Sequence, residues 1–228
     1  VNWRKAAINT ALDWDQAVSK YRKKLESDGL REGAVDRTLR SIDSYGEAEL
    51  YDKIYADSPR FNTKPNKLLV SAVKDRPAGE ALDVAMGQGR NSIFLAMQGW
   101  QVTGFDVAEA GLAKARQLAE SGGVKIKTVL SSDEDFDFGQ SRWDLIVAIY
   151  AMEKRSVHRI RNALKPGGMV VVEAGHKSAS GAPFEYESNE LLRIFKGFRI
   201  LRHEEVTDLP DWGKGPIRIV RIVAEKPR

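Results

Sequence analysis

Cysteine is absent from all 228 residues of the chain. Its absence excludes a disulfide framework, a thiolate zinc site and a cysteine nucleophile. It also suits a reducing compartment, so we expect a cytoplasmic protein. There is no run of about 18 apolar residues, so we expect no membrane-spanning segment. Because the chain begins at Val1 rather than Met, the sequence leaves open a removed upstream signal.

Clustered charge is missing as well. The 36 basic and 32 acidic residues are interspersed, with a formal net charge of +4. A nucleic-acid-binding protein more often shows a basic stripe. No constellation of His, Asp and Glu has metal-ligand spacing. We therefore expect neither nucleic acid, nor a membrane, nor a metal ion as a partner.

From residue 80 onward, apolar strands alternate with amphipathic helices. We expect strands at 81–85, 101–105, 125–130, 144–149 and 168–173, with helices at 90–98, 109–120 and 153–164 between them. This alternation predicts a parallel sheet with helices on both faces. A short helix at 189–195 is then expected, followed by segments 199–205 and 217–225. No helix separates these two, so they predict an antiparallel hairpin. The fold class is therefore a Rossmann-like three-layer α/β/α sandwich with seven strands, mostly parallel.

The first part of the chain differs from the rest. Apolar residues recur at steps of three and four over 2–26, which predicts a helix. Further helices are expected at 33–44, 47–55 and 65–75. We divide the chain into an N-terminal helical extension, residues 1–45, and a main domain, residues 46–228. The extension could cap a substrate pocket or form an oligomer interface.

A glycine turn follows the first strand of the main domain. Gly87 and Gly89 let the backbone approach a ligand closely, because no Cβ intervenes. Asp83 lies near the end of that strand, and Asp106 ends the next one. Such a strand–turn–helix unit is typical of a nucleotide-type cofactor site. A dinucleotide fingerprint would have a third glycine where Ser92 stands.

Several motifs occur in order along the main domain: Asp83-x-Ala85-x-Gly87-x-Gly89, Asp106, Asp133–Phe136, Trp143-Asp144, Leu164–Gly168 and the terminal hairpin. In this order the chain resembles the class I S-adenosylmethionine-dependent methyltransferases. Gly87–Ser92, the stretch 99–106, Tyr51, Tyr55 and Pro65-Asn66 are similar to the small-molecule branch that includes tellurite-resistance and thiopurine-type enzymes. Ala85 departs from the pattern, because the family usually has glycine there.

The resemblance implies S-adenosyl-L-methionine as cofactor and S-adenosyl-L-homocysteine as product. Asp83 would then face the cofactor's ammonium group, and Asp106 would accept the two ribose hydroxyls. The full set of expected cofactor-binding residues is Asp83, Ala85, Met86, Gly87, Gly89, Arg90, Asn91, Asp106, Val107, Asp133, Asp135, Phe136, Ala148 and Ile149.

The acceptor side is less defined. The candidate catalytic residues are Tyr51, Tyr150 and His176, with Tyr55 and Glu173 as further acceptor-side residues. Methyl transfer is an in-line displacement, and a general base is needed only if the acceptor starts protonated. The expected acceptor is a small molecule.

Three alternatives stay open at this stage. One is an NAD(P)-linked oxidoreductase, and another is a cofactor-binding protein without methyl transfer. The third is a nucleic-acid methyltransferase. The third is disfavoured, since the chain has no Asn/Asp-Pro-Pro-Tyr motif for base amino groups and no cysteine for carbon methylation.

Overall fold

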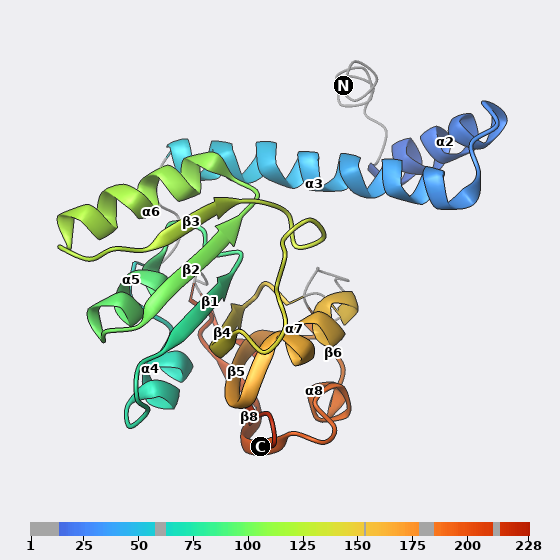
Figure 1. Cartoon of the computed structure of the whole chain (residues 1–228). Helices are drawn as coiled ribbons and strands as arrows, with labels where there is room; N and C mark the ends of the chain where they lie inside the picture. Colours follow the sequence, from blue (N-terminus) through green and yellow to red (C-terminus); the bar gives the residue numbers. More distant parts are fainter. Residues whose placement is uncertain (1–13, 58–62, 153, 178–184, 212–214) are drawn as a thin grey trace. The chain divides into compact units, whose positions relative to one another are not determined.

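The computed structural model describes residues 14–57, 63–152, 154–177, 185–211 and 215–228 (Figure 1). The chain divides between Ala48 and Glu49 into two compact units, and each is described by itself. Among the described residues, no helix combines the length and apolar character needed to cross a membrane.

Helices make up the described part of the first unit. α2 (Trp14–Ser27) is followed by α3 (Glu32–Asp57), whose final residues belong to the second unit. Leu25, Val35 and Leu39 are buried together, with Tyr21 packed against them. Residues 2–13 of the expected first helix lie outside the described residues.

α3 corrects one expectation. The two helices expected at 33–44 and 47–55 are a single helix of 26 residues. Gly46 lies inside it and does not end it. A glycine in a helix interior costs only about 1 kcal/mol, and α3 contains no proline to stop it.

The second unit contains the sheet. Its main strands run in the order β3-β2-β1-β4-β5-β8-β7, and β8 is antiparallel to both of its neighbours. The predicted parallel strands and terminal hairpin are confirmed. The strands are β1 (Glu80–Val84), β2 (Gln101–Asp106), β3 (Lys127–Leu130), β4 (Trp143–Ile149), β5 (Leu164–His176), β7 (Arg199–Asp208) and β8 (Ile217–Glu225).

Two details of the sheet differ from the prediction. A two-residue strand, β6 (Glu185–Tyr186), pairs in parallel with β5, and it is too short to show a periodicity. β5 begins at Leu164, where the end of a helix was expected. The preceding helical region is a short 3-10 turn, η1 (Lys154–Ser156), followed by α7 (Val157–Ala163).

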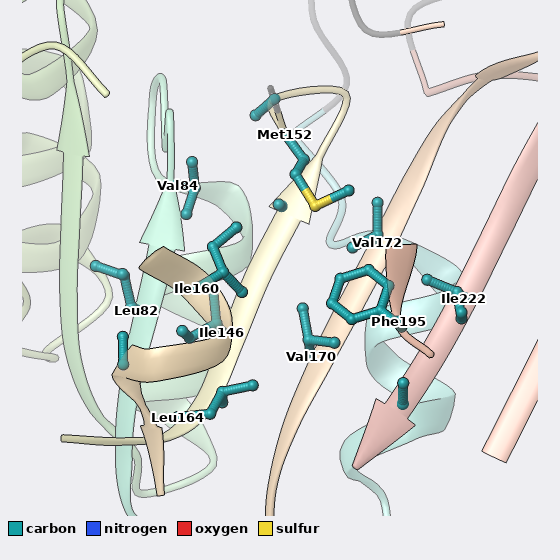
Figure 2. Packing of buried hydrophobic residues seen from close by; sticks show 14 of the residues in the cluster. Leu82, Val84, Ile146, Met152, Ile160, Leu164, Val170, Val172, Phe195 and Ile222 are labelled. Carbon is teal, nitrogen blue, oxygen red and sulfur yellow. The ribbon is translucent and has the colours of Figure 1, made fainter. Parts of the chain in front are cut away.

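Helices cover the sheet on two faces. Side chains alternate along each strand, so Leu145 and Val147 of β4 face one layer while Ile146 and Ala148 face the other. The first layer includes α4 (Lys67–Val73) and α5 (Arg90–Met97). α7 and α8 (Glu190–Ile194) contribute Ile160, Leu191 and Phe195 to the opposite core, part of which Figure 2 shows. The carboxyl ends of β1, β2 and β4 therefore meet at one edge of a three-layer sandwich, where open α/β sheets bind ligands.

Candidate functional site

The glycine turn joins β1 to α5. Ala85, Gly87 and Gly89 all have left-handed backbones, with φ of 49°, 53° and 79°. Met86 fixes the turn through its N–H, which donates to the Phe105 carbonyl at 2.9 Å. A Cβ on Gly89 would lie 2.8 Å from the Ala115 Cβ. Glycine at 87 and 89 is thus required by backbone angle and by space, whereas Ala85 carries the same kind of angle with a methyl group.

Asp83 lies beneath this turn and is 2% exposed. Its carboxyl group accepts a hydrogen bond from the Ser92 hydroxyl at 2.7 Å. Burial raises the pKa of Asp83 to about 6, against the lowering effects of Ser92 and Arg90. A cationic ligand group beside this carboxyl would favour its charged form. Ser92, read from sequence only as a missing glycine, therefore serves the site directly.

Asp106 ties the end of β2 to the turn. One carboxylate oxygen accepts the Gly87 N–H at 2.8 Å and the other accepts the Ala108 N–H at 2.9 Å. Burial raises its pKa, while these backbone donors oppose the rise. Each carboxylate oxygen can accept more than one hydrogen bond, so both retain capacity for a pair of hydroxyl donors. Val107, partly buried, follows directly.

The segment after β3 holds an unused acceptor. Among the described residues, the buried Oδ1 atom of Asp133 has no hydrogen-bond partner, while its Oδ2 accepts the Ser156 hydroxyl. Arg159 donates to the Asp133 carbonyl at 2.5 Å and so fixes this segment. A buried carboxylate oxygen without a donor is costly unless a ligand supplies one. Asp133 is therefore well suited to accept from an amino group.

Asp135 and Phe136 behave differently. Asp135 is exposed, and its carboxylate accepts the Ser132 hydroxyl at 2.7 Å. Phe136 is 6% exposed and stacks on Phe105 with ring centroids 4.2 Å apart. The structure thus places the ring of Phe136, expected from the motif to contact the cofactor, chiefly in the core.

A polar cluster follows the ends of β4 and β5. Glu173 is 2% exposed and accepts hydrogen bonds from Arg221 at 2.6 Å and Asn66 at 2.9 Å. Tyr150 follows Ala148 and Ile149 with a left-handed φ of 56°, and its N–H donates to the Glu173 carbonyl at 2.7 Å. Burial, then the charge of Glu173 and a hydrogen bond to it, raises the pKa of the Tyr150 hydroxyl well above its ordinary value. Tyr150 therefore stays protonated and can donate, but it cannot act as a phenolate base.

Asn66 makes long-range hydrogen bonds that the sequence does not predict. Its side-chain amide donates to Glu173 and to Asp211, each at 2.9 Å. Its side-chain oxygen caps α4 by accepting the Leu68 and Leu69 N–H groups. The pattern Asn-Lys-Leu-Leu predicts such a cap. It carries no information on the distant partners, which lie more than a hundred residues along the chain.

Arg90 and Asn91, expected to contact the cofactor, are also joined to this cluster. Arg90 donates to Asp211 at 2.5 Å and to the Lys64 carbonyl at 3.0 Å. The Asn91 side chain accepts the Asn66 N–H at 2.9 Å. Both residues therefore hold neighbouring segments at the start of α5.

The three candidate catalytic residues lie on or next to different elements of the structure. Tyr51 lies beside Tyr55, with ring centroids 6.3 Å apart, in the last turns of α3. His176 shares a face of β5 with Val172 and Ala174, opposite Glu173. Its Nε2 lies 3.0 Å from the Ser188 hydroxyl and 3.8 Å from Glu205. The structure thus does not bring His176 to the cluster of Tyr150 and Glu173.

Comparisons with known proteins agree with this geometry. Residues 81–168 match the family model described as a methyltransferase domain. TehB of Haemophilus influenzae, named a probable S-adenosyl-L-methionine-dependent methyltransferase, is 28% identical over 164 residues, which cover 65% of this chain and 56% of TehB. The chain spans about half the length of such curated TehB relatives.

Solved structures share the fold. The crystal structure of TehB from Haemophilus influenzae has a TM-score of 0.61 and 23% identity, covering 69% of this chain and 61% of that one. The 1,6-didemethyltoxoflavin-N1-methyltransferase of Burkholderia thailandensis, solved with S-adenosylhomocysteine, has a TM-score of 0.61 and 19% identity, with coverages of 87% and 92%.

The sheet order, the glycine turn and the strand-end acids are those of the fold of class I S-adenosylmethionine-dependent methyltransferases, and residues 81–168 match a methyltransferase domain. Among such proteins, the chain is similar to TehB in sequence and in fold.

Proposed function

We propose that this chain binds S-adenosylmethionine at the carboxyl edge of β1, β2 and β4 and transfers its methyl group to a small-molecule acceptor. The observation that carries the proposal is the set of three carboxyl groups that lie near the ends of the parallel strands β1, β2 and β3. Asp83 is buried and accepts from one hydroxyl, Asp106 retains acceptor capacity, and Asp133 has a buried oxygen with no donor among the described residues. These needs match an ammonium group, a pair of ribose hydroxyls and an adenine amino group, so the residues fit the cofactor.

Further residues complete the proposed site. Ala85, Met86, Gly87 and Gly89 supply the backbone of the turn, while Arg90 and Asn91 hold the start of α5. Val107, Asp135, Ala148 and Ile149 would line the remaining wall, and Phe136 would support that wall from the core.

The cofactor supplies a methyl group already activated by the sulfonium. The work left to this chain is therefore orientation and exclusion of water, which together can account for most of the acceleration. Tyr150 holds its proton and serves to orient an acceptor through a hydrogen bond. Arg221 and Asn66 fix Glu173, whose charge acts on the Tyr150 hydroxyl. We propose no general base for this reaction.

Three finer points are part of the same proposal. Residues 1–45 form an extension that covers the acceptor pocket or joins a second copy of the chain, and residues 46–228 form the catalytic domain. The protein acts in the cytoplasm. The small acceptor is supported by the toxoflavin methyltransferase, whose name describes a small-molecule substrate.

Thermal unfolding with added ligand tests the cofactor. A ligand that binds the folded protein raises the midpoint temperature. S-adenosylhomocysteine is expected to raise it and NAD is not; the reverse pattern would instead support an oxidoreductase. A screen of small acceptors with labelled S-adenosylmethionine, read by product mass, then tests transfer. Cofactor binding without any labelled product across a broad screen would favour a binding protein.

A further inference from the structure

The last turns of α3 are fastened to the start of α6 (Glu109–Ser121). The side chain of Asp52 accepts the Ala110 N–H at 2.8 Å. Amide groups in the first turn of a helix have no partner within the helix. The N-cap residue of α6 is Ala108, which offers no side-chain acceptor. Asp52 therefore supplies, from another helix, a cap that the local sequence of α6 lacks.

Tyr55 lies three residues after Asp52, on the same side of α3. A Cβ on Gly87 would lie 2.3 Å from the Tyr55 hydroxyl, and a Cβ on Gly111 would lie 3.0 Å from two of its ring carbons. These two glycines leave the space that the Tyr55 side chain fills. The ring thus lies between the glycine turn and α6, within the unit that carries the proposed site.

The Tyr55 hydroxyl is influenced by the carboxyl groups of the proposed cofactor site. Burial, followed by the negative charge of Asp106, raises the pKa of its hydroxyl well above the ordinary value. Asp83 and Arg90 also act on this hydroxyl. The Tyr55 hydroxyl is therefore a neutral donor beside the groups assigned to the ribose and amino-acid parts of the cofactor.

We propose that Asp52 is a positioning residue of the cofactor site, which holds the end of α3 so that Tyr55 closes the glycine turn over bound S-adenosylmethionine. This inference rests on the proposed function. Releasing the Asp52 contact would loosen the cover while leaving the carboxyl groups of Asp83 and Asp106 in place. The charge of Asp52 adds to burial in raising the pKa of Asp106, and one of the variants below keeps this charge. The expected effect is faster dissociation of the cofactor.

The test measures the affinity and dissociation rate of S-adenosylhomocysteine with purified full-length protein, so no acceptor is needed. Asp52→Ala removes the acceptor, and we expect about tenfold weaker binding, mostly through the dissociation rate. Asp52→Asn keeps an oxygen that can accept the Ala110 N–H, so it should restore much of the affinity. Lys53→Ala, an exposed neighbour on α3, is the matched control and should bind like the wild type.

Two further variants separate positioning from simple stability. Ala110→Pro removes the N–H donor while leaving Asp52 in place, and proline is tolerated in the first turn of a helix. Ala110→Pro should therefore show the same faster dissociation that is expected of Asp52→Ala. It keeps the proposal testable if Asp52→Ala folds poorly. Tyr55→Ala should also weaken binding, and adding Asp52→Ala to it should weaken binding no further, because Asp52 acts through Tyr55.

The outcomes are distinct. Wild-type affinity in both Asp52→Ala and Ala110→Pro would overturn the inference, and so would additive effects of Asp52→Ala and Tyr55→Ala. If the wild-type protein itself does not bind S-adenosylhomocysteine, the proposed function fails instead.

Discussion

At the scale of single residues, the carboxyl group of Asp83 is enclosed by protein, with the Ser92 hydroxyl as a donor. Its pKa of about 6 lies above the value near 4 that an aspartate has in an unfolded chain. The folded state therefore binds this proton more tightly than the unfolded state. The contribution of Asp83 to stability is fully present below about pH 4 and is lost as pH rises through about 6.

Replacing the carboxyl group of Asp83 should therefore stabilise the folded protein but weaken cofactor binding. We expect Asp83→Asn to raise the free energy of unfolding at pH 7.5 by about 1–3 kcal/mol, since Asn can still accept from Ser92 without a buried charge. The same variant should bind S-adenosylhomocysteine more weakly. Urea unfolding at pH 7.5 and pH 5 measures the first effect, with the exposed Asp75→Asn as control. A gain that is as large at pH 5 as at pH 7.5 would contradict this explanation.

The backbone conformation of Ala85 is a second local source of destabilisation. Its φ of 49° is left-handed, where a Cβ costs roughly 1 kcal/mol relative to glycine. The residue is exposed at the turn, so its methyl group faces the ligand side rather than the core.

Ala85→Gly should relieve this strain. We expect the free energy of unfolding to rise by roughly 0.5 kcal/mol, because the relief slightly exceeds the extra entropy of glycine in the unfolded chain. Binding of S-adenosylhomocysteine should become tighter, as more room is left above the turn. Calorimetric titration and urea unfolding check both points, and a loss of affinity would show that the methyl group makes a useful contact.

Individual residues also show what a sequence pattern can and cannot predict. Asp83 and Asp106 follow from strand ends, because the carboxyl ends of parallel strands meet at one edge. Asn66 and Tyr55 reach their partners across long stretches of chain, and only the folded structure brings these together. The motif predicts that Phe136 contacts the cofactor, whereas its ring packs in the core against Phe105.

At the scale of elements, α4 begins at a residue that also joins three other segments. Asn66 caps α4 and connects to α5 through Asn91, to β5 through Glu173 and to the loop after β7 through Asp211. The side chain is 1% exposed, so water cannot replace these partners. One amide thus sets the relative placement of several elements around the polar cluster.

Substitutions at Asn66 should separate these roles. Asn66→Ala should lower the free energy of unfolding by about 2–4 kcal/mol, through the lost cap and the carboxylates left with fewer donors. Asn66→Asp keeps the cap but adds a negative charge beside Glu173 and Asp211, so its cost should be large at pH 8 and smaller at pH 5. Chemical denaturation at both pH values measures this, with the exposed Asn162→Ala as control. A cost of Asn66→Asp that does not change with pH would argue against charge repulsion.

Helix boundaries were predicted less well than helix positions. α5 and α6 lie close to their expected ranges because glycine turns precede or follow them. The sequence predicts two helices separated at Gly46, but α3 is continuous. A lone glycine is a weak helix-ending signal that packing and length override.

At the scale of the whole molecule, the parallel strands and the terminal hairpin could be predicted because hydrophobic period and connection type are local features. β6 could not be predicted, because two residues pair with β5 only when the sheet has already formed.

The division of the chain leads to a prediction about its parts. The second unit has its own extensive apolar clusters on both faces of the sheet, whereas the described residues of the first unit form a cluster with three buried residues. A chain of residues 46–228 should therefore unfold in one cooperative transition and bind S-adenosylhomocysteine with the affinity of the full chain. Circular dichroism during urea unfolding and calorimetric titration check this. Weak binding by the shorter chain would show that the extension supports the cofactor site.

The position of β8 has a consequence for synthesis on the ribosome. This strand is the last in the chain, yet it lies between β5 and β7 and contributes Arg221 to the polar cluster. Until residues 217–225 leave the ribosome, one edge of β5 has no partner there, and its apolar side chains lack part of their cover. Between the synthesis of β5 and that of β8, the nascent chain therefore carries an unpaired sheet edge, which favours pairing with other chains until β8 is added.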